Sequence, residues 1–196
     1  MQLTHLENYS EIGKFISQLL NGTELFLASS SPRRKEILSW TGVHFQVKIP
    51  NYSEATEMAD NPENIVQKNS LKKVESVSSQ IQSGIILGAD TIVVLNNEIL
   101  GKPADEAEAY LMLKKLNGNW HTVYSGVAVL NQRNLKKITA YESTKVKFHS
   151  LSDEQILKYV ASGDPLDKAG AYGIQSQGSF LVEKIEGNFD NVMGLP

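Results

Sequence analysis

Residues 25–38 have the sequence Leu25-Phe26-Leu27-Ala28-Ser29-Ser30-Ser31-Pro32-Arg33-Arg34-Lys35-Glu36-Ile37-Leu38, which predicts a buried strand that runs directly into a helix. Ser31 is a good N-cap residue, and Pro32 suits the first helical position because its missing N–H would have no partner there. A helix N-terminus at the tip of a strand offers free backbone N–H groups and the positive end of the helix dipole. Both features favour phosphate.

The first turn of this helix carries two arginines, Arg33 and Arg34. Cations in a first turn oppose the helix dipole, so these side chains need a compensating anion. At about 100° per residue they share a helix face with Ile37, Leu38 and Trp40, which is the face expected to meet the core. A solvated, merely basic helix start is the alternative interpretation. The inward orientation expected for the two arginines favours an oligophosphate site.

Length, charge and composition limit the function classes. A chain of 196 residues suits one domain or two small lobes, and a net charge of −3 argues against a general nucleic-acid or membrane-surface binder. The absence of cysteine excludes disulfides, thiolate metal sites and a cysteine nucleophile. The four histidines show no helical pairing typical of metal ligands. With no signal-like or long apolar segment, we expect a cytoplasmic protein without membrane or nucleic-acid partners.

Residues 6–21 predict an amphipathic helix that packs on the body of the fold, with an apolar stripe of Ile12, Phe15, Ile16, Leu19 and Leu20. A second helix is predicted over residues 61–79, because Asn61-Pro62 provides a cap and a first-turn proline. Lysines at 68, 72 and 73 lie along it. On pattern alone, lysines on a helix are surface residues.

Residues 85–95 form a β-branched, nearly continuous apolar run, which predicts a strand covered on both faces. Asp90 lies in its middle, where burying an unpaired carboxylate would cost several kcal/mol. Asp90 therefore needs a partner, a metal or a solvent-filled cleft. Gly88 indicates a bulge or a close backbone approach. A structural aspartate that caps nearby amides is the alternative, but a functional carboxylate is favoured.

The rest of the chain adds further elements. Asn96-Asn97 predicts a hairpin turn, and the bend at Gly101-Lys102-Pro103 places Lys102 beside the base of the hairpin. Two helices with capping patterns (Asp105 with Glu108, Ser152 with Gln155) flank strands at 122–130 and 139–148. Residues 164–175 combine two glycines, a carboxylate–lysine pair and Gln175, which favours a loop shaped around a ligand over a plain connection.

Six motifs occur in an order that resembles the Maf (septum-formation-inhibitor-like) nucleotide pyrophosphatases. They are Ser29-Ser30-Ser31-Pro32-Arg33-Arg34, Gly88-Ala89-Asp90-Thr91-Ile92-Val93, Gly101-Lys102-Pro103, Leu116-Asn117-Gly118, Tyr124-Ser125-Gly126-Val127 and Asp167-Lys168-Ala169-Gly170-Ala171-Tyr172-Gly173-Ile174-Gln175. The resemblance covers about residues 25–196. It implies an N-terminal helical extension at 1–23 and one Maf-like domain at 24–196.

The resemblance implies an α/β fold of the Maf/ITPase type: a bent mixed sheet flanked by helices, with two lobes around a central cleft. It also implies metal-dependent cleavage of nucleoside triphosphates to monophosphate and pyrophosphate. Arg33 directly after Pro32, together with the Gln175 sequence, resembles the dTTP/UTP pyrophosphatase branch. The chain departs from its relatives in ending at Pro196, where they commonly continue into a final helix.

Site residues follow from the matching motifs. Asp90 corresponds to the catalytic proton acceptor, and Lys72 and Lys102 to lysines expected near the phosphates. Ser29, Ser31, Arg33, Arg34, Thr91 and Gln175 are the expected substrate-binding residues. Asp90 and Glu54 are the expected ligands of a divalent cation, Mg²⁺ or Mn²⁺, because hard oxygen ligands and phosphates favour these ions. A homodimer is a candidate assembly.

Two other functions stay open at this point. One is a house-cleaning pyrophosphatase of broader specificity that also acts on modified nucleotides. The other is a nucleotide-binding regulator of cell division that does not hydrolyse its ligand.

Overall fold

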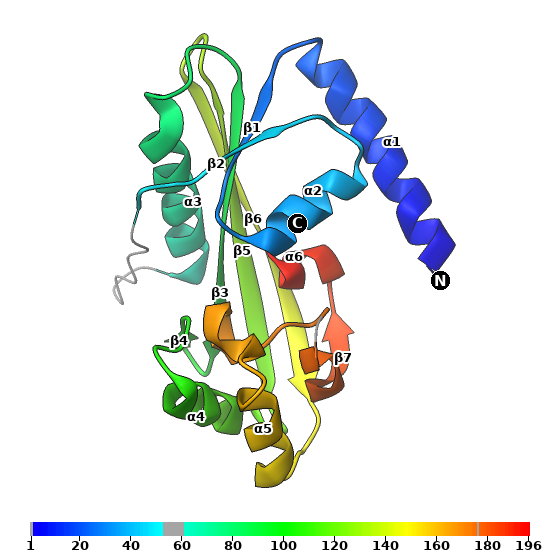
Figure 1. Cartoon of the computed structure of the whole chain (residues 1–196), viewed down its shortest axis with the longest axis vertical. Helices are drawn as coiled ribbons and strands as arrows, with labels where there is room; N and C mark the ends of the chain where they lie inside the picture. Colours follow the sequence, from blue (N-terminus) through cyan, green and yellow to red (C-terminus); the bar gives the residue numbers. More distant parts are fainter. Residues whose placement is uncertain (1, 53–60, 176) are drawn as a thin grey trace.

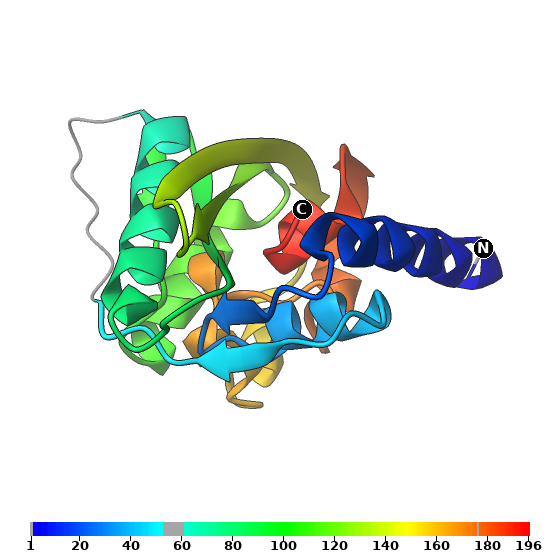
Figure 2. The same cartoon turned by 90° about the horizontal axis from the view of Figure 1, so that it is seen from above.

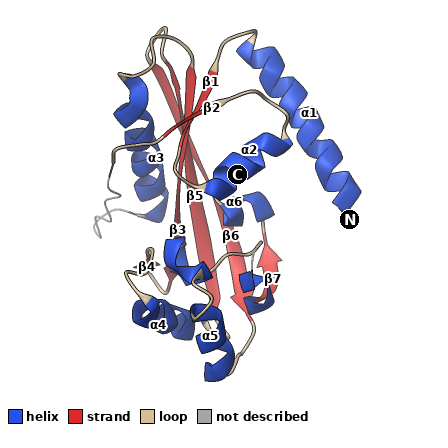
Figure 3. Cartoon of the chain, viewed as in Figure 1, coloured by secondary structure: helices blue, strands red, loops and turns tan. Residues whose placement is uncertain are grey.

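The computed structural model describes residues 2–52, 61–175 and 177–196. In this part of the chain a mixed seven-stranded sheet is flanked by helices (Figures 1 and 3). This confirms the predicted fold class. The elements are α1 (Gln2–Leu20), β1 (Leu25–Ala28), α2 (Pro32–Trp40), β2 (Gln46–Lys48), α3 (Pro62–Ser78), β3 (Ile85–Leu95), β4 (Glu98–Leu100), α4 (Glu106–Leu116), β5 (Trp120–Asn131), β6 (Lys136–Phe148), α5 (Asp153–Val160), η1 (Asp164–Asp167), η2 (Ala169–Ala171), η3 (Gln177–Leu181), β7 (Val182–Glu186) and α6 (Phe189–Met193).

The strand order is β2-β1-β3-β5-β6-β7, with β4 paired to β3 as a hairpin. β1 runs parallel to β2 and β3, whereas the other pairs are antiparallel. The hairpin turn between β3 and β4 uses Asn96 and Asn97 with positive φ, as their sequence predicts.

Two lobes share this sheet. In Figure 1 the long strands β3, β5 and β6 run through the whole molecule, with α1, α2 and α3 around one end and β4, α4 and α5 around the other. We call the end with α1, α2 and α3 the upper lobe and the end with β4, α4 and α5 the lower lobe. One apolar cluster fills the lower lobe. Two others lie on the two faces of the sheet in the upper lobe, where α2 covers one face and α3 the other. The crossing from β1 into α2 and the middle of β3 therefore lie where the lobes meet.

The N-terminal helix packs on the body with only part of its predicted apolar stripe, because Ile16 and Leu20 are half-buried against an apolar cluster of the body while the other stripe residues are exposed. Tyr9 and Gly13 are buried, whereas Phe15 and Leu19 are 61% and 70% exposed. The reason is the close approach of α1 to the end of α2: a Cβ on Gly13 would lie 1.8 Å from the Thr41 carbonyl oxygen. Tyr9 contacts the Trp40 ring edge-on and donates a hydrogen bond to Asp190. Figure 2 shows the rest of α1 extending away from the body.

Helix α3 lies unusually close to the sheet, because two glycines remove side chains from its path. A Cβ on Gly126 of β5 would lie 2.4 Å from the Val66 backbone, and one on Gly88 of β3 would lie 2.9 Å from the Ser70 carbonyl oxygen. Gly126 is the direct cross-strand partner of Asp90. This contact therefore brings α3 against the middle of β3, and the close approach predicted at Gly88 is confirmed.

Gly126→Ala tests this packing. The added methyl group meets backbone rather than a flexible side chain, so helix and sheet must separate, at a cost of about 1–3 kcal/mol in the free energy of unfolding. Chemical denaturation measures the loss. Gly101→Ala is the matched control, because a Cβ there meets nothing within 4 Å. Equal stability of the two variants would contradict the account.

Candidate active site

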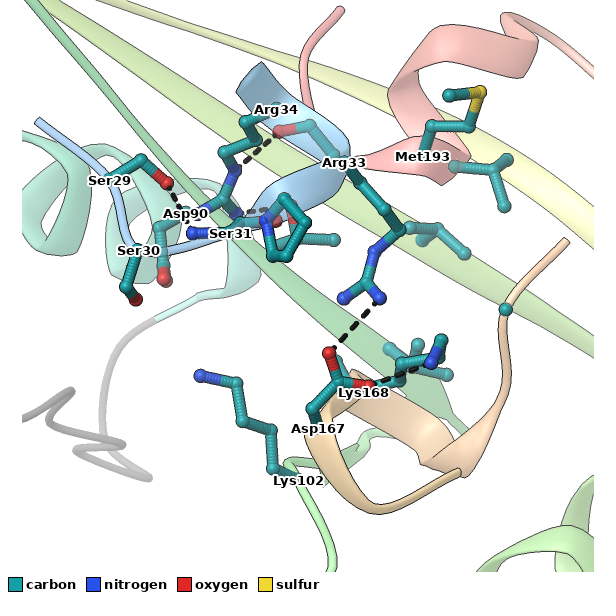
Figure 4. Close-up of a pocket in the computed structure, with 18 of the residues that line it drawn as sticks. Ser29, Ser30, Ser31, Arg33, Arg34, Asp90, Lys102, Asp167, Lys168 and Met193 are labelled. Atoms are coloured by element: carbon teal, nitrogen blue, oxygen red, sulfur yellow. Dashed lines mark hydrogen bonds and ion pairs between the residues drawn. The ribbon is translucent and has the colours of Figure 1, made fainter. Parts of the chain in front are cut away.

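A cavity of about 450 Å³ opens between the two lobes. The described residues that line it include five cationic side chains and two carboxylates, so a polyanion is the ligand that its charge favours. Figure 4 shows Ser29, Ser30, Asp90 and Lys102 toward one end of this cavity and Met193 toward the other. The charged residues are Arg33, Arg34, Lys73, Lys102, Lys168, Asp90 and Asp167.

The three serines form the turn between β1 and α2 and line the upper wall. Ser29 is buried, and its hydroxyl accepts a hydrogen bond from the Ser31 N–H at 3.1 Å. Ser31 is the N-cap residue and Pro32 follows at the first helical position, as predicted. The Ser31 hydroxyl makes no capping hydrogen bond in this structure. The helix start is thus left to face the cavity, which is where the dipole favours phosphate.

Asp90 lies in the middle of β3 and is 1% exposed, yet it borders the cavity. Its Oδ1 accepts a hydrogen bond from Lys73 Nζ at 2.6 Å, and its Oδ2 accepts one from Asn69 Nδ2 at 2.9 Å. Asn69 and Lys73 are one turn apart on α3, on the face that meets the sheet. The carboxylate therefore has the charge partner that its burial requires.

The lysine at the cavity is Lys73 and not Lys72, which corrects the placement expected for Lys72. The side chain of Lys72 is exposed and forms an ion pair with Glu75 on the outer face of α3, away from the cavity lining. Lys73 is 5% exposed, so its interpretation as a surface residue is also wrong. The two neighbours differ because successive helical positions face about 100° apart.

The two arginines of α2 have different surroundings. Arg34 donates to the Gly194 carbonyl oxygen at 2.8 Å and to the Thr91 hydroxyl at 3.0 Å, so it ties α2 to β3 and to the end of α6. Thr91 also hydrogen-bonds Ser125 at 2.8 Å. Arg33 reaches across the cavity to Asp167 of η1 at 3.3 Å (Figure 4). A phosphate group can therefore replace Asp167 as the partner of Arg33, since the Asp167 side chain is mostly exposed.

The lower wall comes from the segments around Lys102 and residues 167–175. Figure 4 shows the Lys102 side chain directed into the cavity from its loop. Lys168 donates to Asp167 at 2.7 Å, and, although burial opposes ionisation, Lys168 and Arg33 hold the pKa of Asp167 below its usual range. Gln175 also lines this wall, so the structure brings the predicted Ser29, Ser31, Arg33, Arg34, Asp90, Thr91, Lys102 and Gln175 to one cavity.

Glu54, the other expected metal ligand, lies outside the described residues. Within the part of the chain that is described, no three histidine or acidic side chains gather into a ready cation site. The donor set at Asp90 nevertheless fits one mode of binding. Each of its oxygens keeps a lone pair beyond the hydrogen bond that it accepts, and Mg²⁺ is commonly held by one or two carboxylates together with substrate phosphates and water.

A family model described as Maf-like protein matches residues 24–196, and the chain belongs to this family. Three similar proteins are each named dTTP/UTP pyrophosphatase. The protein from Dictyoglomus turgidum is 49% identical over 174 residues, covering 88% of this chain and 90% of its own. The Symbiobacterium thermophilum protein is 49% identical, covering 88% of each chain, and the Bacillus cereus protein is 46% identical, covering 90% of this chain and 86% of its own.

Among solved structures, a nucleoside-triphosphatase / dITP/XTP pyrophosphatase from Mycobacterium abscessus matches with a TM-score of 0.40 and 14% identity. This match covers 64% of this chain and 72% of that one, and it is too distant to bear on function. Across the described residues, no helix is both long and apolar enough to cross a membrane.

His121 of β5 supports the lower wall from behind. Its Nε2 hydrogen-bonds the Tyr172 hydroxyl at 2.8 Å, and its ring packs edge-on against Tyr172 and Phe148. Burial lowers the pKa of His121 to about 4, whereas an exposed histidine titrates near 6.5. The unfolded chain therefore binds a proton at this site more readily than the folded protein does.

The stability that this histidine contributes is present above about pH 6.5 and is lost as the pH falls toward 4. We expect His121→Gln to remove about 2 kcal/mol of the acid-induced stability loss over this window. Urea titrations at pH 7 and pH 4.5 measure the difference. His44→Gln is the control, because the His44 side chain is exposed. A His121→Gln protein that loses as much stability between the two pH values as the wild type does would contradict the assignment.

Proposed function

We propose that this protein hydrolyses dTTP and UTP to the nucleoside monophosphate and pyrophosphate. The observation that carries the proposal is a buried, paired carboxylate, Asp90, that borders a cavity rich in cations at a helix N-terminus. This arrangement provides both parts that the reaction needs, namely a basic oxygen and a cradle for phosphates. The names of the similar proteins support the same activity.

In the proposed reaction a water molecule attacks the α-phosphorus, and the bond to the bridging oxygen of the pyrophosphate group breaks. Asp90 takes the proton of the attacking water, directly or as a cation ligand. Arg33, Lys73 and Lys102 offset charge on the phosphoryl oxygens, where most of the catalysis of phosphoryl transfer arises. The turn at Ser29–Ser31 and the start of α2 orient the phosphate chain.

A divalent cation, Mg²⁺ or Mn²⁺, is part of this proposal. Asp90 and Glu54 are its proposed protein ligands, and the nucleotide phosphates and water would complete the coordination. When bound, the cation would neutralise phosphate charge and make a water molecule more acidic.

We assign recognition of the base to the end of the cavity near Met193, away from Asp90 and the serines. Gln175 can both donate and accept hydrogen bonds, which suits the edge of uracil or thymine. Apolar side chains, among them Val123, Ile174 and Met193, line the cavity and can cover a base ring. Thr91 stays a proposed substrate contact, although its hydroxyl already bonds Arg34 and Ser125. We also place the activity in the cytoplasm, and a homodimer stays a prediction.

The direct test is release of pyrophosphate by the purified protein from dTTP, UTP, CTP, 7-methyl-GTP and ITP, each with Mg²⁺ or Mn²⁺. We expect dTTP and UTP to give the highest kcat/KM, and chelation of the cation to abolish turnover. Equal turnover across the panel would replace the proposal with a house-cleaning enzyme of broad specificity. Tight nucleotide binding without pyrophosphate release would replace it with a nucleotide-binding regulator.

A further inference from the structure

Two residues that the mechanism does not use form a chain of hydrogen bonds behind Asp90. Asn69 of α3 is 3% exposed, and its Nδ2 donates to Asp90 Oδ2 at 2.9 Å. Its Oδ1 accepts a hydrogen bond from the Tyr52 hydroxyl at 2.9 Å. Tyr52 follows β2 and itself lines the cavity. The chain Tyr52–Asn69–Asp90 thus runs from the cavity wall to the buried carboxylate.

The carboxylate determines which way the amide points, and the tyrosine holds the amide in place. An asparagine side chain has one oxygen that only accepts and one nitrogen that only donates. Because an ionised carboxylate only accepts, the nitrogen faces Asp90, and the oxygen accepts a hydrogen bond from the Tyr52 hydroxyl. The opposite amide orientation would oppose two oxygens at hydrogen-bond distance.

The amide in turn restricts rotation of the carboxylate. The terminal torsion of an aspartate is broad, so one contact does not fix the plane of its oxygens. Lys73 holds Oδ1 and Asn69 holds Oδ2 from the same helix, one turn apart. Two anchors on different oxygens select one rotation, which leaves the remaining lone pairs in a constant direction. A reacting group held in one orientation gains a large part of its rate advantage from that alone.

A buried asparagine at position 69 lowers the stability of the fold unless its amide has a role such as holding Asp90. Apolar residues occupy most of the other buried positions on α3, namely Ile65, Val66, Val74 and Val77, and the remaining ones are Ser70 and Lys73. Asparagine is a weaker helix former than leucine, and its amide must find partners when buried. A leucine would satisfy the packing without either requirement.

We propose that Asn69, held in place by Tyr52, is a positioning residue that keeps the Asp90 carboxylate in its reactive orientation. The proposal rests on the function proposed above, in which Asp90 acts on the attacking water. Neither residue contacts the reacting atoms through the bonds described here. Their effect should therefore appear in kcat and not in nucleotide affinity.

The test compares Asn69→Leu, Tyr52→Phe and the double variant by kcat and KM for pyrophosphate release from UTP. For Asn69→Leu we expect kcat to fall about 10–100-fold with KM within about threefold, in the range for lost positioning. For Tyr52→Phe we expect a fall of several-fold that adds nothing in the Asn69→Leu background, since the tyrosine acts only through the amide. Asn64→Leu, an exposed asparagine of the same helix, is the matched control and should keep the wild-type kcat.

A readout without turnover accompanies these rates. The side-chain amide of Asn69 should give a slowly exchanging pair of proton resonances at one nitrogen-15 shift, which Asn69→Leu removes and Tyr52→Phe shifts. Retention of kcat within twofold in Asn69→Leu would overturn the proposal. If that variant does not fold, an unchanged kcat and an unshifted amide in Tyr52→Phe would overturn it instead. A wild-type protein that releases no pyrophosphate would contradict the proposed function, whereas an active wild-type protein with unaffected variants would contradict the positioning role alone.

Discussion

The ion pair between Lys73 and Asp90 is the contact on which the cavity depends. A carboxylate in the middle of a buried strand is unfavourable unless a cation reaches it, and here that cation is Lys73, 17 residues earlier in the chain. Lys73 can reach only because α3 lies directly on the sheet at Gly126 and Gly88. Two residues without side chains thus determine where two charged residues meet. The same contact brings Asn69 to the second oxygen, so one packing arrangement provides charge balance and orientation together.

Groups of a different kind, from both lobes, complete this site. Arg34 is used to join α2, β3 and α6, while Arg33 and Lys102 project toward the space where an anion would lie. Asp167 meets Arg33 across the cavity, and a polyphosphate would compete with it for that guanidinium. Hydrogen-bonded groups therefore surround Asp90, whereas the more accessible cations Arg33 and Lys102 face the side where we expect the substrate. This division suits an enzyme that must hold its reactive group still and exchange a highly charged ligand.

Much of this arrangement could be predicted from local sequence. Pro32 begins α2, and the arginines share the inward face with Ile37 and Leu38, because these features depend only on helix geometry. The need of Asp90 for a partner was also predictable, but its identity was not, since that depends on how α3 docks against distant strands. One signal was present: Asn69 and Lys73 continue the helical period of Val66 and Val77, so polar residues occupy core-facing positions. A helical pattern of apolar residues alone does not show that these polar positions face the core. The face of α1 was predicted only in part for a similar reason, since the contact of Gly13 with Thr41 leaves Phe15 and Leu19 exposed while Ile16 and Leu20 pack.

The most direct test of the Lys73–Asp90 pair as the catalytic centre is kcat for pyrophosphate release from UTP by Lys73→Met and Lys72→Met, with circular dichroism to confirm folding. We expect kcat to fall about 100-fold or more in Lys73→Met, which leaves Asp90 without its charge partner. In Lys72→Met we expect kcat to change within about twofold, because the exposed ion pair of Lys72 contributes little. Wild-type turnover in a folded Lys73→Met protein, or an equal loss in both variants, would contradict a catalytic role of the Lys73–Asp90 pair.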